Sequence, residues 1–328
     1  MTWRDAIADI SHWDPLSRAG RLRAARDLCA DLGAAFTPLR SLFGARRLAA
    51  VKHVDTKVTF VIVPGGRLRM GITEAELDEI LALARSLPDC DSSVLEDLRG
   101  QVGCSRPVHD VAVHPFLCAR APLLERLARE AVQAWESGAY RALFDDQKQL
   151  RARKPAQLTR REAASAVGRL SFRLPSEAEW EWIAREGGRT SWVCAKLSSQ
   201  DWRPHRAAAA QCAMEAFIAG ITDPDVVNGF GVWGLLWGEW VADVWHRNYE
   251  GAPEFASAWD AEPETQMLRA LGAATFWPWQ NPREFVACHA GFRTWTAERL
   301  QSACVRFALD LPPGRIGTYS TETGTTSY

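Results

Sequence analysis

The segment FRLPSEAEWEW, residues 172–182, constrains the fold more than any other stretch of this chain. Ser176 followed three residues later by Glu179 is a capping box, in which the serine hydroxyl and the glutamate carboxylate each accept a hydrogen bond from a backbone N–H at a helix start. Glu181 and Arg185 are four residues apart and therefore spaced for an ion pair. The segment predicts a capped helix whose carboxylates are structural, and it argues against a general acid and base pair.

Tryptophan is the strongest compositional bias, with 15 residues in a chain of 328. Many of these tryptophans fall between Trp180 and Trp295, and Trp180 is placed to anchor the predicted helix on the core. An indole combines a large apolar surface with an N–H group that needs a hydrogen-bond partner when it is buried. The C-terminal half is therefore expected to be a loop-rich region held together by large aromatic side chains.

Hydrophobic periodicity and turn residues outline the elements of the N-terminal half. A second capping box, formed by Thr73 and Glu76, marks another helix start. The patterns predict a helix over 16–32, a buried strand over 58–63, a helix over 73–87, a polar loop over 88–106, an edge or half-buried strand over 108–116 and a helix over 122–135.

Charge and hydropathy exclude several classes of partner. The 39 basic and 40 acidic residues give a formal net charge of -1, so no overall field favours nucleic acid or an anionic membrane. The most basic stretch, residues 145–162, lacks the aromatic residues that single-strand sites interleave with basic ones. The N-terminus has no signal-like apolar run, and no segment reaches the roughly 20 apolar residues of a membrane span. We therefore expect a cytoplasmic protein that binds neither nucleic acid nor membrane.

The cysteines are scattered and form no C-x-x-C pair. This spacing argues against a zinc ribbon and, in a reducing compartment, against a disulfide framework. We expect most of them to be small buried side chains. The eight residues are Cys29, Cys90, Cys104, Cys118, Cys194, Cys212, Cys288 and Cys304.

Five phrases follow one another in a fixed order: VIVPGGRLRMG, RPVHDVAVHPF, FRLPSEAEWEWIAREGG, NGFGVWG with GEWVADVW, and a late AGF with CVRFA. Together they resemble the framework phrases of the formylglycine-generating enzyme family, also called the sulfatase-modifying-factor domain. The resemblance implies an α+β fold with little regular secondary structure, related to the C-type-lectin-like fold, over residues 56–320. Residues 1–50 would form an N-terminal helical extension. The resemblance does not transmit activity by itself, because members include oxidases, sulfoxide synthases and binding proteins.

The family's oxidases hold Cu(I) between two cysteines about five residues apart, because thiolates suit a soft ion. Cys304, in CVRFA, fits the second of these cysteines. Trp295 stands near the position of the first, and the nearest alternative, Cys288, comes before the glycine phrase. The resemblance therefore argues against a copper site, and whether Cys288 and Cys304 meet in space is left open.

Other members of the family use histidine-bound iron or carry structural calcium. The seven histidines of this chain contain no H-x-x-x-H-x-E cluster, which argues against iron. The calcium phrase GNVWEW is kept only at its end, where Glu239, Trp240 and Asp243 match, while Gly234 replaces an aspartate of the family. The resemblance thus leaves Glu239 and Asp243 as the remnant of a calcium site, with calcium as the one candidate cofactor.

The sequence motifs of the family's framework are present, whereas its metal-binding motifs are incomplete. We therefore expect a non-oxidising module that binds a protein or peptide, for example as a component of an immunity or conflict system. The matching part of the family lines a cleft, and tryptophan and arginine dominate binding hot spots. Core packing of the indoles and ion pairing of the arginines would explain the same residues equally well. The predicted cleft residues are Trp240, Arg293, Trp295, Arg299, Arg306 and Tyr319.

The alternative hypothesis is a divergent metal-dependent oxidase of a peptide or small-molecule thiol, with Cys304 as metal ligand or nucleophile. A second sulfur or a histidine within about 4 Å of Cys304 in an open pocket would support this hypothesis, and a buried, isolated Cys304 would argue against it. The sequence leaves the oligomeric state and the identity of the partner open.

Overall fold

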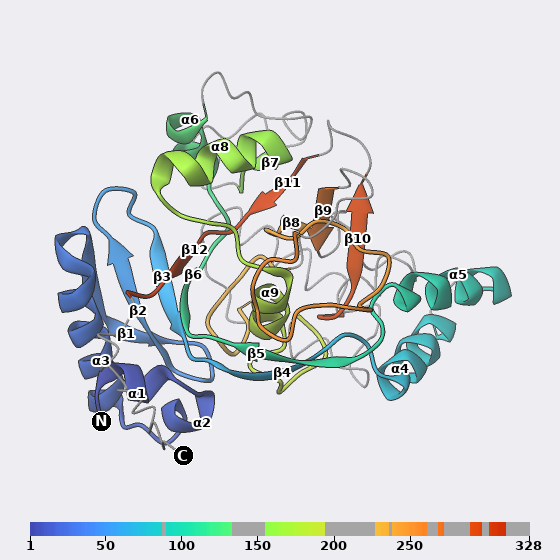
Figure 1. Cartoon of the computed structure of the whole chain (residues 1–328), viewed down its shortest axis with the longest axis horizontal. Coiled ribbons are helices and arrows are strands. Elements are labelled where there is room, and N and C mark those ends of the chain that lie inside the picture. Colours follow the sequence, from blue (N-terminus) through green and yellow to red (C-terminus); the bar gives the residue numbers. More distant parts are fainter. Residues whose placement is uncertain are drawn as a thin grey trace, which may run out of the picture.

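Two five-stranded sheets and a two-stranded ribbon organise the described part of the chain, with one helix near the centre (Figure 1). Because helices and strands are both present, the expected α+β class is confirmed. Within the described residues, no helix has the length and apolar character needed to cross a membrane. The computed structural model describes residues 1–86, 90–132, 155–193, 227–235, 238–260, 268–271, 289–296 and 302–312.

The first sheet has the strand order β1-β2-β3-β6-β12 and is antiparallel throughout. The run VTFVIV, predicted to be a buried strand, forms β3 and pairs with β6 so that Ile62 lies opposite Leu117. Both strands are buried almost along their whole length, so both faces of the sheet pack into the core here. The strands are β1 (Phe36–Phe43), β2 (Leu48–His53), β3 (Thr59–Val63), β6 (Phe116–Ala119) and β12 (Ala308–Asp310).

The second sheet has the order β10-β9-β8-β11-β7. Strands β8 and β11 are parallel, and the other neighbours are antiparallel. Cys304 lies on β11, opposite Glu239 on one side and Gln157 on the other, so it belongs to an inner strand. The strands are β7 (Gln157–Thr159), β8 (Glu239–Trp240), β9 (Leu268–Leu271), β10 (Arg293–Thr296) and β11 (Ser302–Val305).

The N-terminal helices lie beside β1 and β2 (Figure 1). They are α1 (Trp3–Ile7), α2 (Ile10–Trp13) and α3 (Arg18–Leu32), followed by the 3-10 turn η1 (Gly33–Ala35). Helix α3 matches the predicted amphipathic pattern and buries Ala25 and Leu28 completely. The extension expected over residues 1–50 is helical only in this first part, because the chain enters the first sheet at Phe36.

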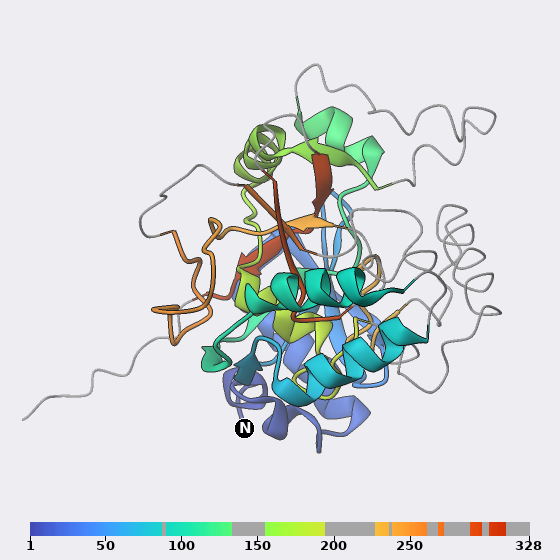
Figure 2. The ribbon, with the colours of Figure 1, turned by 90° about the vertical axis from the view of Figure 1, so that its right-hand side faces the viewer.

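Helices α4 (Glu74–Arg85) and α5 (Ser92–Gly103) lie side by side at one end of the molecule (Figure 2). The predicted helix over 73–87 is confirmed as α4. Helix α5 corrects the prediction of a polar loop over 88–106. Asp91 caps it by accepting a hydrogen bond of 3.0 Å from the backbone N–H of Val94, and Leu98 and Val102, four residues apart, are buried.

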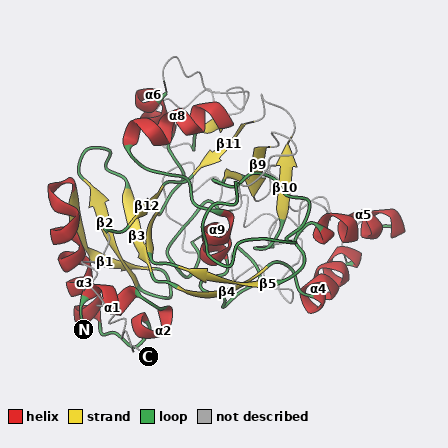
Figure 3. Ribbon diagram, in the orientation of Figure 1, coloured by secondary structure: helices red, strands yellow, loops and turns green. Residues whose placement is uncertain are grey.

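The remaining helices are α6 (Glu125–Ala131), α8 (Arg160–Leu170) and α9 (Glu177–Ala184), and the ribbon consists of β4 (Gly66–Met70) and β5 (His109–Val113). Helix α9 lies near the centre, against the ribbon (Figure 3), and every one of its residues is buried. A Cβ at Gly66 would lie 2.7 Å from the ring of Trp182, so the ribbon approaches the helix as closely as a glycine permits.

Three buried indoles find the hydrogen-bond partners that the tryptophan content leads us to expect, whereas the Nε1 of the buried Trp13 has none among the described residues. Trp180, Trp182 and Trp240 are at most 1 % exposed. Each of these three indole N–H groups therefore replaces a bond to water with a bond inside the core. Two of the bonds tie α9 to β8 and to the turn before β4, and the third joins β8 to β7. The acceptors are Glu239 Oε2, Pro64 O and Leu158 O, at 2.8, 3.0 and 2.6 Å respectively.

Candidate functional site

Helix α9 carries three glutamates, and each is neutralised inside the protein. Glu179 closes the predicted capping box with Ser176 and also accepts two hydrogen bonds, of 2.6 and 2.7 Å, from Arg173. Glu181 pairs with Arg185 at 2.7 Å, as their spacing predicts. The helix glutamates are at most 5 % exposed, so these partners replace the water that the carboxylates lose. Internal ion pairs thus explain the acidity of the segment.

Glu181 and Arg185 also fix the end of β4. The N–H of Gly71 donates to Glu181 Oε1 at 3.0 Å, and Arg185 Nη2 donates to the Gly71 carbonyl at 2.6 Å. Gly71 has a φ of +103°, and a Cβ there would lie 2.6 Å from the carbonyl of Ser105, so the position requires glycine. Ile72 N–H donates to the same carbonyl at 3.0 Å. The segments that follow β4 and α5 are therefore held together.

Glu177 holds a second buried arginine, Arg293. Arg293 Nε lies 3.1 Å from Glu177 Oε1, which also accepts a hydrogen bond of 2.7 Å from the Tyr249 hydroxyl. The guanidinium lies over the Tyr249 ring, 4.0 Å from its centroid, and donates to the carbonyls of Cys104 and His246. Arg293 therefore joins strand β10 to the end of α5 and to the loop that carries Tyr249.

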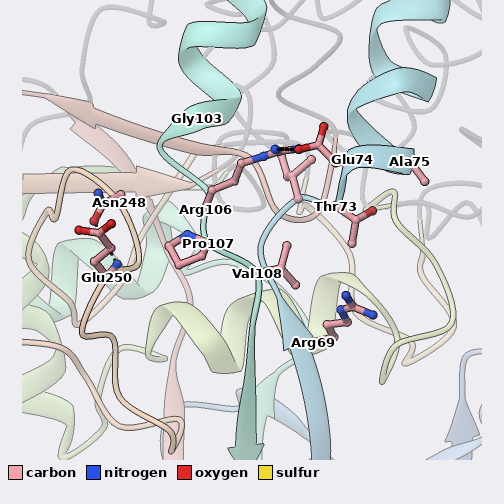
Figure 4. A pocket seen from close by; sticks show the side chains of 11 residues that line it. Arg69, Thr73, Glu74, Ala75, Gly103, Arg106, Pro107, Val108, Asn248 and Glu250 are labelled. Carbon is pink, nitrogen blue, oxygen red and sulfur yellow. Dashed lines mark hydrogen bonds and ion pairs between the residues drawn. The ribbon is translucent and has the colours of Figure 1, made fainter.

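A pocket of about 890 Å³ lies where these segments meet (Figure 4). Its walls come from the end of β4, the start of α4, the segment after α5 and the loop around Tyr249. Tyr249 N–H donates to the Arg106 carbonyl at 2.6 Å, so two of these walls are bonded to each other. The polar lining residues are Arg69, Thr73, Glu74, Arg106, Asn248 and Glu250.

The pocket presents both signs of charge and an amide. Arg106 points toward Glu74 and forms an ion pair with it (Figure 4), and the hydrogen bond from Arg106 lowers the pKa of Glu74. Arg69 is exposed and has no ion-pair partner within the described ranges. Asn248 Oδ1 accepts from the N–H of Glu250 at 3.0 Å. Among the described residues no cysteine or histidine lines the pocket, so it offers recognition groups rather than a thiol or an imidazole.

Three of the predicted cleft residues lie in the interior instead. Arg306 is completely buried and donates to both carboxylate oxygens of Glu239, at 2.5 and 2.9 Å. Trp240 is also completely buried, and Arg293 is 3 % exposed. The prediction that Trp240, Arg293 and Arg306 line an open cleft is therefore corrected. Core packing of the indole and ion pairing of the arginines describe them, because all three side chains are buried and their polar groups contact internal partners.

The other predicted residues of the C-terminal segment are described only in part or not at all. Trp295 lies on β10, and its side chain falls outside the described part of the structure. Arg299, Tyr319 and Cys288 lie outside the described residues. Their roles in binding, and a meeting of Cys288 with Cys304, stay predictions.

Glu239 and Asp243 do not fit a calcium cage. Both oxygens of Glu239 accept hydrogen bonds from Arg306. Asp243 accepts backbone N–H bonds from Glu177 at 2.6 Å and from Trp259 at 3.0 Å, and burial raises the pKa of Asp243 to about 7. Calcium takes six to eight oxygen ligands, whereas the described part of the chain contains no group of three or more acidic, histidine or cysteine side chains able to hold a metal.

Cys304 does not fit a copper site as it is placed. It is 2 % exposed on an inner strand of the second sheet. Burial raises the pKa of the Cys304 thiol, and the neighbouring Glu239 carboxylate raises it further, so the thiol stays protonated at neutral pH. Because Cys304 is buried on an inner strand, it is not open to a Cu(I) ion or to a substrate thiol in this structure.

Sequence reasoning did not identify Arg69, Arg106, Asn248 or Glu250 as site residues. The available signal was the alternation in β4, which buries Leu68 and exposes the arginines on either side of it. The loop that carries Asn248 and Glu250 reaches β4 only through tertiary contacts, which the sequence pattern does not show.

The fold and the buried framework define the class of the protein. The sequence predicts a capped helix with an indole anchor over this segment, and the structure adds that the whole helix is buried against the ribbon. The chain belongs to the FGE-sulfatase family, because the sulfatase-modifying factor enzyme 1-like domain matches residues 46–297.

Two solved structures are similar to this chain. PvdO from Pseudomonas aeruginosa superimposes with a TM-score of 0.50 and 22% sequence identity, over 80% of this chain and 98% of PvdO. Treponema denticola variable protein 1 has a TM-score of 0.45 and 12% identity, over 78% of this chain and 96% of its own. No curated protein matches the chain significantly. The likeness to PvdO concerns the fold alone.

Proposed function

We propose that this chain is a recognition member of the FGE-sulfatase family that binds a protein or peptide segment in the pocket of Figure 4. The observation that carries the proposal is the pocket itself, a cavity of about 890 Å³ with charges of both signs at its rim. This volume lies within the range of about 300–1,000 Å³ that ligand sites occupy.

The lining groups suit a peptide. Asn248 and Arg106 offer an amide and N–H donors to backbone groups, and the partly exposed Val108 offers an apolar contact. Arg69 lacks an internal counterion within the described residues, so we expect the bound segment to place an acidic side chain against it. The ion pairs of Glu177 and Glu181 fix the walls before binding, which reduces the conformational entropy that a ligand has to overcome.

The position of Cys304 supports recognition over thiol oxidation. A thiol oxidase that used Cys304 would need a thiolate within reach of its substrate. Cys304 is instead buried on an inner strand, its thiol is kept protonated by its surroundings, and it does not line the pocket.

Selection of peptides tests the proposal. Random peptides displayed on phage are selected against the immobilised full chain, and the affinity of the enriched peptides is measured by fluorescence anisotropy. We expect a shared acidic residue and at least a tenfold loss of affinity in Arg69→Glu, since reversing one charge contact is worth more than the roughly 1.4 kcal/mol of a tenfold change. Arg67→Glu is the matched control, because Arg67 is exposed on the same strand outside the pocket lining.

Two outcomes would overturn the proposal. One is a failure to enrich any peptide that binds the wild-type chain. The other is an enriched peptide that binds Arg69→Glu and Arg67→Glu equally well, because its site would then lie elsewhere.

A further inference from the structure

A second pocket, of about 200 Å³, lies at the opposite end of β3 from the turn that leads into the ribbon. One wall is the turn between β2 and β3, residues 56–59, and another is the segment from the end of β6 into α6, residues 120–124, 126 and 127. Trp233 and Phe307 complete the lining. This pocket shares no lining residue with the pocket of Figure 4.

The charged lining residues of this second pocket are all basic. They are Lys57, Arg120 and Arg126, and the lining contains no carboxylate. Arg126 has a partner outside the pocket, Glu130, at 3.6 Å and with both side chains more than half exposed. Within the described ranges neither Lys57 nor Arg120 has an ion-pair partner. The pocket therefore holds two cations whose charge no described residue compensates.

Arg120 is held in place by contacts that leave its charge unpaired. Its backbone N–H donates to the Thr59 carbonyl at 2.9 Å, and its Nε donates to the Gly231 carbonyl at 2.7 Å. The guanidinium lies over the ring of Phe43, 4.1 Å from the centroid. Burial is the cause that lowers the pKa of Arg120, and no neighbouring acid opposes it. Partly buried arginines are normally matched by a carboxylate, so this one is preorganised for an anion that the described chain does not supply.

We propose that this pocket binds a doubly charged oxyanion of the phosphate class, either free phosphate or the phosphate group of a small ligand. The planar guanidinium of Arg120 offers two parallel N–H donors, and Lys57 adds a second positive charge at the rim. Two uncompensated cations match the charge of phosphate better than that of a single carboxylate. The volume lies below the range of about 300–1,000 Å³ for drug-sized ligands, so the pocket takes one such group with at most a small substituent.

The test is isothermal titration of the full chain with inorganic phosphate at constant ionic strength, with acetate as the arm for a singly charged carboxylate. We expect saturable heat with phosphate and none with acetate. We expect Arg120→Gln to weaken phosphate binding at least tenfold and Lys57→Asn to weaken it several-fold. Arg67→Gln, which removes an exposed charge from β4 outside this pocket, should bind phosphate like the wild type.

Lys57→Asn keeps the test informative if Arg120→Gln disturbs folding through its contact with Phe43. Lys57 is exposed and has a φ of +61°, a conformation that asparagine adopts more readily than most residues. Thermal unfolding of Lys57→Asn should therefore match the wild type. Absence of saturable phosphate binding, equal binding by Lys57→Asn, or equal binding of acetate and phosphate would each overturn the assignment.

Discussion

Replacing Arg306 by methionine tests whether Glu239 and Arg306 form a structural ion pair. Arg306 donates two hydrogen bonds to Glu239 and one each to the carbonyls of Ala119 and Trp233, and neither side chain of the pair is exposed. The substitution leaves a buried carboxylate without its cation, which costs about 3–5 kcal/mol, and orphans two carbonyls. We expect Arg306→Met to lower the free energy of unfolding by about 5 kcal/mol.

Urea unfolding followed by tryptophan fluorescence gives this free energy. The double variant Glu239→Leu/Arg306→Met should be more stable than Arg306→Met alone, because it leaves no unpaired charge in the core. Arg4→Met is the control: it breaks the pair of Arg4 with Asp31, at 3.0 Å and with both side chains about 40% exposed, and should cost less than about 1 kcal/mol.

A loss in Arg306→Met no larger than in the Arg4 control would contradict the structural interpretation. A double variant less stable than Arg306→Met would contradict it as well. Millimolar calcium should leave the unfolding midpoint of the wild type unchanged. A calcium-dependent rise of the midpoint that Glu239→Gln abolishes would show that Glu239 is a calcium ligand after all.

Three other buried groups give separate tests. Native Cys304 should resist iodoacetamide at neutral pH and react only after unfolding in urea, because burial raises the pKa of its thiol; fast modification of the native chain, seen by peptide mass spectrometry, would contradict this. Burial lowers the pKa of His289 to about 3 from an ordinary 6.5. As the pH falls, the unfolded chain therefore binds this proton before the folded chain does. The free energy of unfolding should decrease from about pH 6.5 toward pH 3. His289→Phe should flatten this decline in urea titrations at several pH values, and an unchanged slope would refute the assignment. Gly71→Ala should lower the free energy of unfolding by about 1–3 kcal/mol in urea titrations, because Gly71 has a positive φ and the carbonyl of Ser105 lies close to it. Gly100 has open space around it, so Gly100→Ala should not lower the free energy of unfolding in the same titrations.

The local elements could be predicted from the sequence because their determinants are local. The capping boxes of Thr73 and Ser176 accept hydrogen bonds from N–H groups of their own helices. The run VTFVIV at 58–63 is almost entirely apolar, so its composition alone predicts a buried strand. Helix α5 was missed because Pro88 comes three residues before its cap, Asp91, and because its apolar residues are diluted by polar ones. The pattern of Leu98 and Val102 becomes readable only once the face that they cover is known.

The site could not be predicted in the same way. Arg293 and Arg306 are residue types that dominate binding surfaces, and the same types form buried ion pairs. Which of the two applies depends on whether Glu177 and Glu239, far away in sequence, come within hydrogen-bond distance, and only the tertiary structure decides this. The framework phrases identify the scaffold, and the pocket arises where the loop around Tyr249 meets β4 and α5.

Hydrogen exchange of the full chain with and without a selected peptide tests the central claim most directly, because it locates the binding site without any substitution. Amides of residues 69–75, 103–108 and 248–250 are expected to gain protection on binding, while amides of 302–312, around Cys304, exchange as before. Protection confined to 302–312, with none around the pocket, would contradict the claim that this family member recognises its partner there.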